Sequence, residues 1–204
     1  MYEKYNEPLV LLLCGIVLLS LSAIQPHDYT TWLLEIMPIL IAAPILIATY
    51  KRHPLTPLVY RLLFAHALIL MLGGHYTYAE VPLGYWMQDW FEFTRNNYDK
   101  IGHLAQGFVP AMLFRELLLR HSPLHQGKLL FTLVAASCLA VSASYELVEW
   151  AAAVLLGQGA DAFLGTQGDI WDTQSDMLMA LIGALSAQLL LANIQDKQLP
   201  LKTA

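Results

Sequence analysis

Apolar residues along this chain fall into six long runs, separated by short polar or proline-containing segments. The runs lie at about residues 8–25, 30–50, 58–76, 100–120, 129–156 and 173–194. A helix crosses a hydrocarbon core of about 30 Å with roughly 20 residues, and each run approaches or exceeds that length. The pattern predicts an all-α polytopic membrane protein: a six-transmembrane-helix bundle in which residues 1–204 form a single integral membrane domain.

Prolines refine this prediction. Pro8 stands at the beginning of the first run, where proline suits the start of a helix. Pro38, Pro44 and Pro110 lie inside later runs and predict kinks in those helices.

The connection over residues 77–98 carries a shorter apolar pattern. Its apolar side chains recur at i, i+3, i+4, i+7 and i+8, with polar residues largely between them: Leu83, Trp86, Met87, Trp90 and Phe91. This predicts a short amphipathic helix that lies in the membrane interface between the third and fourth spans. Such a helix would either anchor the protein as an aromatic belt or cover a site as a lid, and the pattern allows both.

The composition supports a membrane location. Apolar residues make up 57% of the chain and charged residues 13%, about half the share of a soluble domain. The formal net charge of −5 gives no support to a nucleic-acid role. Membrane lipids are therefore the expected surroundings.

Basic residues set the expected orientation, because cytoplasmic loops are enriched in lysine and arginine. With the N-terminus inside, nine of the eleven basic residues fall on the inner side: Lys4, Lys51, Arg52, Arg61, Arg115, Arg120, Lys128, Lys197 and Lys202. Only Arg95 and Lys100 fall outside. We expect a multi-pass protein of the bacterial inner membrane with both termini in the cytoplasm.

Three polar groups stand out because they lie inside or beside the later apolar runs. They are Asp99, Lys100 and His103; Glu146 and Glu149; and Asp169, Asp172 and Asp176. Residues three or four apart share one face of a helix, and the expected orientation brings all three groups toward the outer leaflet. Ionisable side chains in a membrane helix are costly and normally face the bundle interior or a wet cavity. The sequence therefore predicts one buried polar site.

The acidic residues are candidates for binding a metal ion. Glu146 and Glu149 lie one turn apart and would repel each other without protons, a cation or basic partners. The candidate ligands are Glu146, Glu149, Asp172 and Asp176, with Asp169 and His75 as further candidates. Carboxylates and histidine fit a divalent metal such as Mg, Mn, Zn or Fe. Alternatively, Lys100 and His103 neutralise the carboxylates in a purely structural network.

The fourth run supplies candidate catalytic residues. Asp99 is spaced to orient His103 as a general base or a further ligand, and Lys100 is placed to hold an anion. Other charged residues have simpler interpretations. We expect Glu35 at the interface, and Arg115, Glu116 and Arg120 at the inner end with local ion pairs.

Four segments resemble the YjdF-like inner-membrane proteins: GHYTYAEVPLG, NNYDKIGHLAQGFVPA, YELVEW and GDIWDTQSDM. A more distant similarity is to the VanZ-like membrane proteins linked to teicoplanin resistance. Their Asp-Lys-x-x-His, later Glu and Asp-x-x-x-Asn-x-x-Gly pattern resembles Asp99, Lys100, His103, Glu146 or Glu149, Asp176 and Gly183, with Ala180 in place of the Asn. This second resemblance implies a role in the cell envelope.

These observations favour a divalent-metal-dependent enzyme that acts on a lipid or lipid-linked envelope substrate at the outer leaflet. A metal-bound water attacking a phosphoryl or acyl group would be the chemistry. One alternative is a transporter or permease that uses the same carboxylates for protons or cations. Another is a structural scaffold in the membrane.

Overall fold

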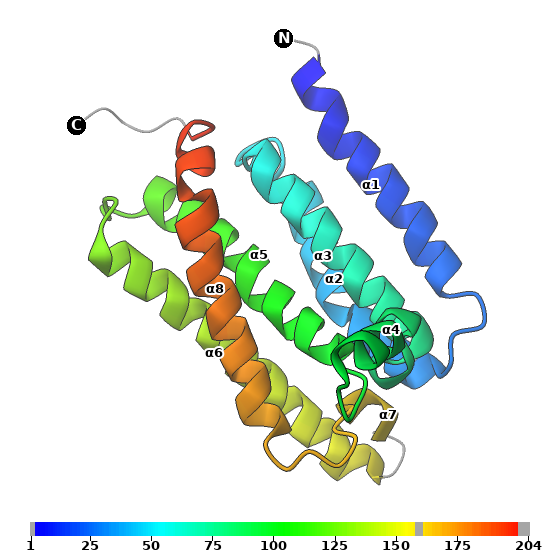
Figure 1. The fold of residues 1–204 in the computed structure, drawn as a ribbon. Helices are drawn as coiled ribbons and strands as arrows, with labels where there is room; N and C mark the ends of the chain where they lie inside the picture. Colours follow the sequence, from blue (N-terminus) through cyan, green and yellow to red (C-terminus); the bar gives the residue numbers. More distant parts are fainter. Residues whose placement is uncertain (1–2, 158–160, 200–204) are drawn as a thin grey trace.

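The computed structural model describes residues 3–157 and 161–199, and these residues form a bundle of long helices (Figure 1). The long helices are α1 (Glu3–Ser22), α2 (Tyr29–Thr49), α3 (Pro57–Tyr76), α5 (Tyr98–His121), α6 (Lys128–Leu156) and α8 (Asp172–Asp196). Short elements connect them: η1 (Tyr78–Glu80), α4 (Pro82–Phe91) and α7 (Asp161–Leu164). The prediction of an all-α fold is confirmed for the described residues.

The six long helices coincide with the six apolar runs, with one clear error at the first. The helix α1 begins at Glu3, so Pro8 lies inside the helix and not at its start. It also ends at Ser22, three residues before the predicted end at Gln25. Asp28 then caps α2 by accepting a 2.6 Å hydrogen bond from the Thr31 N–H, which holds the pKa of Asp28 below its usual value.

Within the described residues, four helices are long and apolar enough to cross a membrane: α2, α3, α6 and α8. The apolar part of α1 is shorter, Glu7–Ser22. The helix α5 carries charged residues at both ends, among them Lys100 and Arg115. Length and composition therefore mark four candidate membrane spans among the described helices.

The two ends of the bundle differ (Figure 1). The start of α1 and the end of α8 lie at one end, and α4 and α7 lie at the other. The helix α5 packs against α3, α6 and α8, and an apolar core forms among them around Met112, Val134 and Cys138. Lys202, one of the basic residues expected inside, lies outside the described residues.

Helices α5 and α8 approach each other very closely because both carry small residues where they meet. A Cβ atom on Gly107 would lie 1.7 Å from the Ala180 carbonyl oxygen, and one on Gly183 would lie 2.1 Å from the Leu104 carbonyl oxygen. Small residues permit such close backbone packing between membrane helices. This crossing brings the start of α8 beside the start of α5.

The predicted short helix in the connection over residues 77–98 is present as α4. Its large apolar side chains, including Trp86, Trp90 and Phe91, are exposed to the surroundings of the protein. Its position in a membrane interface stays a prediction.

Candidate functional site

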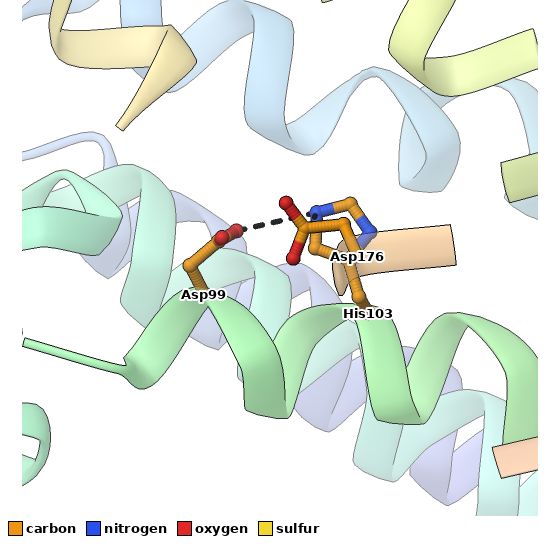
Figure 2. A group of neighbouring side chains, drawn as sticks. All are labelled: Asp99, His103 and Asp176. Atoms are coloured by element: carbon orange, nitrogen blue, oxygen red, sulfur yellow. Dashed lines mark ion pairs between the residues drawn. The ribbon is translucent and has the colours of Figure 1, made fainter. Parts of the chain in front are cut away.

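Helices α5, α6 and α8 bring their polar residues together at the end of the bundle that carries α4 and α7. Asp99 and His103 come from the start of α5, and Asp176 comes from the start of α8 (Figure 2). Glu146 and Glu149 join them from α6. The side chains of these five residues are buried, so the predicted clustering of three separate polar groups is what the fold produces.

Lys100 neutralises one side of this cluster. Its Nζ donates to Asp172 Oδ1 at 2.8 Å and to Asp176 Oδ1 at 2.7 Å, and lies 3.6 Å from Asp99 Oδ2. Asp172 and Asp176 thus bind the Lys100 ammonium, and neither side chain caps the first turn of α8. Buried charges persist when they are paired and hydrogen-bonded in this way.

Arg95 belongs to the same network, and the sequence analysis missed it. Its Nη1 lies 2.8 Å from Asp172 Oδ1 and 3.5 Å from Asp169 Oδ2, and its Nη2 lies 3.7 Å from Asp99 Oδ2. The sequence nevertheless contained a signal that Arg95 belongs to the site. The four aspartates singled out in the sequence had only Lys100 and His103 as expected counter-charges, and Arg95 was the one further basic residue expected on the same side.

His103 connects two acidic groups through its two ring nitrogens. The Nε2 atom lies 3.2 Å from Asp99 Oδ1 and 3.9 Å from Asp176 Oδ1. The Nδ1 atom lies on the other side of the ring from Asp99 (Figure 2), 3.9 Å from Glu146 Oε1 and 3.2 Å from Gln106 Oε1. The predicted pairing of Asp99 with His103 is therefore present.

The two glutamates on α6 lack the compensation that the aspartates have. No lysine or arginine of the described chain forms an ion pair with Glu146 or Glu149. Glu146 Oε1 is buried and has no hydrogen-bond partner. His103 is the basic group that faces this pair.

Three of the six predicted metal ligands belong to clusters that could hold an ion, and the other three lie elsewhere. Two groups of three residues hold ligand atoms within 4.8 Å of one another: Asp99, His103 and Asp176; and His103, Glu146 and Glu149. Asp172 lies with Lys100, and Asp169 lies beside Arg95. The Nδ1 atom of His75 faces elsewhere, 3.0 Å from the Ser22 carbonyl oxygen on α1. Metal binding itself stays a prediction.

A cavity of about 690 Å³ opens from this site and extends along the bundle. Asp99, His103, Glu149 and Glu35 line its polar end. Apolar side chains from α1, α2 and α3 line most of the rest, including Leu12, Ile39, Ala42, Leu46, Leu63 and Phe64. On α2 the lining reaches from Glu35 to Ala48, a rise of about 20 Å, and Lys51 lines the cavity beyond the end of this helix.

Glu35 is a second residue whose place was missed. It was expected at the interface, but it is buried, with 4% of its surface exposed, and Tyr145 Oη lies 3.5 Å from its Oε2. The signal was its isolation, because no other charged residue occurs between residues 30 and 50. A lone carboxylate in an apolar helix normally faces the bundle interior.

The opposite end of the bundle holds a separate polar network. Glu116 is fully buried and accepts hydrogen bonds from Thr56 N at 3.0 Å, Thr56 Oγ1 at 2.7 Å and Arg120 Nη1 at 2.7 Å. Arg115 donates to Gln195 Oε1 at 2.9 Å and to Asp196 Oδ1 at 2.7 Å. These residues join α3, α5 and α8, so the expectation of merely local ion pairs there was incomplete.

Comparisons with known proteins agree with the first resemblance noted above. Residues 7–197 match the family described as "Predicted membrane protein (DUF2238)". The chain is 51% identical over 196 residues to "Inner membrane protein YjdF" of Escherichia coli (strain K12). The aligned residues cover 95% of this chain and 94% of that protein. No solved structure matches the chain.

Proposed function

The chain belongs to the DUF2238 family of predicted membrane proteins, and we propose from its cavity and polar cluster that it is an inner-membrane enzyme acting on a lipid or lipid-linked substrate. The substrate's hydrocarbon chain would occupy the cavity along α2, and its polar end would meet His103. The continuity of the buried His–carboxylate cluster with an apolar cavity carries this proposal.

The shape of the cavity supports a long-chain amphiphile. Ligand cavities commonly measure about 300–1,000 Å³, and the volume here falls in that range at about 690 Å³. Its length of about 20 Å along α2 exceeds one leaflet of the hydrocarbon core, about 15 Å. Four ionisable side chains gather at one end, Lys51 lines the other end, and mostly apolar side chains line the length between them. This distribution matches a molecule with one polar end and a long chain.

The same proposal places six helices across the membrane and both termini in the cytoplasm. The basic residues favour this orientation, with nine on the inner side and two on the outer side. The polar end of the cavity would then lie near the outer leaflet. The helix α4 would lie in that interface as an anchor, because its aromatic side chains face outward and none of its residues lines the cavity.

Enzyme chemistry at this site would use His103 as its central group. Asp99 Oδ1 lies 3.2 Å from Nε2 and fixes the orientation of the ring. Glu35 and Glu149 line the same end of the cavity and are further groups able to exchange protons. Lys100 is committed to Asp172 and Asp176, which supports a structural role for it in place of anion binding.

One observation speaks against the alternative of a proton or cation transporter. The outer cluster at His103 and the inner network at Glu116 are separated on α5 by Ala111 and Met112, both fully buried in the apolar core. No chain of ionisable side chains connects the two networks among the described residues of that core. The scaffold alternative fits the Lys100 network but does not account for the uncompensated Glu146 and Glu149.

A lipid analysis of cells tests the enzymatic role. A strain that lacks the gene should accumulate a lipid or lipid-linked species that the wild-type gene removes. His103→Ala should fail to remove it, since loss of a general acid–base group costs about 10²–10⁴-fold in rate. Ala65→Phe changes an exposed position on α3 outside the cavity and should complement like wild type. Full complementation by a membrane-inserted His103→Ala protein would contradict the enzyme proposal.

A further inference from the structure

We propose that Nδ1 of His103, Glu146 and Glu149 form a binding site for one divalent transition-metal ion. The three residues offer ligand atoms within 4.8 Å of one another, and all three are buried. This inference rests on the proposed function, because the ion would face the polar end of the same cavity. Its test, however, is metal binding and not lipid conversion.

Glu146 provides the observation that goes beyond an acidic cluster. Glu146 has only 7% of its surface exposed, and its Oε1 is buried without any hydrogen-bond partner. This oxygen lies 3.9 Å from His103 Nδ1. A buried carboxylate oxygen without a partner costs free energy, and a cation would remove that cost. Glu149 reaches the same place from one turn further along α6.

The orientation of His103 fits a metal ligand. Metal-binding histidines usually donate the other ring N–H to a carboxylate, which leaves a lone pair for the metal. If Nε2 donates to Asp99 at 3.2 Å, the lone pair lies on Nδ1 and faces Glu146. In the metal-free protein Gln106 Oε1 is placed 3.2 Å from Nδ1 to accept a hydrogen bond from it, so an ion bound at Nδ1 would replace that proton.

The charge distribution favours this triad over the other group of three. Asp176 in the group Asp99–His103–Asp176 already binds the Lys100 ammonium at 2.7 Å. The glutamate pair has no such cation. A set of one imidazole and two carboxylates suits Zn²⁺ or Mn²⁺, while Mg²⁺ prefers oxygen ligands and water.

Metal titration of the purified protein tests the triad. Protein stripped with chelator in mild detergent should bind one equivalent of Zn²⁺ or Mn²⁺ by calorimetry, and Mg²⁺ more weakly. Glu146→Gln and Glu149→Gln should each weaken Zn²⁺ binding by at least tenfold. Asp172→Asn, which alters the Lys100 network alone, should retain wild-type affinity. Circular dichroism and gel filtration would select folded variants for comparison.

A spectroscopic probe covers the case in which a glutamate variant does not fold. Pulsed electron paramagnetic resonance of the wild type with one equivalent of Cu²⁺ should show coupling to a single imidazole. Two results overturn the site: no metal binding by the folded wild type, or loss of binding in Asp172→Asn but not in the glutamate variants. Retention of lipid by the same preparations is measured separately, so failure of the metal site and failure of the lipid proposal remain distinguishable.

Discussion

At the level of single residues, the two polar networks of this protein differ in how completely their charges are paired. Glu116, at the end of the bundle opposite His103, receives hydrogen bonds from Thr56 and Arg120. Glu149, in the cluster around His103, is buried beside Glu146 and has no lysine or arginine partner among the described residues. The first arrangement stabilises the fold, whereas the second buries two carboxyl groups side by side at a cost.

This difference predicts opposite effects of the same substitution. Glu116→Gln should lower the free energy of unfolding by about 3–5 kcal/mol, since it leaves the Arg120 charge without its buried partner. Glu149→Gln should leave the melting temperature of metal-free protein unchanged or raise it, because it removes repulsion with Glu146. Thermal unfolding in detergent measures both. Equal, large losses of stability in the two variants would show that the cluster around His103 is also a structural network.

The sequence identified most of the site residues but not their partners. Carboxylates and histidine in apolar helices are visible in any sequence, because burying them there is costly. Which lysine meets which aspartate depends on how α5 and α8 cross, and that crossing depends on the close approach at Gly107 and Gly183. Lys100 could therefore be expected to bind an anion, while its pairing with Asp172 and Asp176 could not be predicted.

Among the helices, α5 has the most unusual composition for a membrane span. Its charges are confined to its two ends, where Lys100 meets Asp176 and Arg115 meets Asp196 on α8. The middle of α5 packs in the apolar core through Ala111 and Met112. Neighbouring helices thus compensate the charges that make α5 look too polar to cross a membrane.

Reporter fusions test whether α5 crosses. A fusion after Gly84, before α5, should read periplasmic, and a fusion after Leu124, behind α5, should read cytoplasmic. A fusion after Pro57, at the start of α3, is the matched control and should also read cytoplasmic. Readings on the same side for Gly84 and Leu124 would show that α5 does not cross, and a periplasmic reading at Pro57 would reverse the orientation.

Helix positions were predictable because apolar runs of this length are a local property of the chain, and each of the six contains a helix. The start of α1 could not be predicted in the same way, because four polar residues before Pro8 belong to the helix although they lie outside the apolar run. The packing partners of each helix were equally hidden, because they depend on contacts between distant segments.

At the level of the whole molecule, the cavity links the elements into one functional arrangement. Helices α1, α2 and α3 supply its apolar walls, while α5, α6 and Glu35 of α2 supply the ionisable groups at its polar end. The helix α2 packs closely only against α3 and α7 among the described elements, so the cavity separates it from α5 and α6. None of these relations could be predicted from the apolar pattern, which marks helices but not the space between them.

The central claim is that this cavity holds the hydrocarbon chain of a lipid, and mass spectrometry of lipid retained by the purified protein tests it most directly. Wild type should retain about one long-chain lipid per protein after extensive exchange into detergent. Ala67→Phe, which places a ring in the cavity from α3, should lose that lipid, and Ala65→Phe on the exposed side of α3 should keep it. Equal lipid retention by the wild type and both variants would contradict the account.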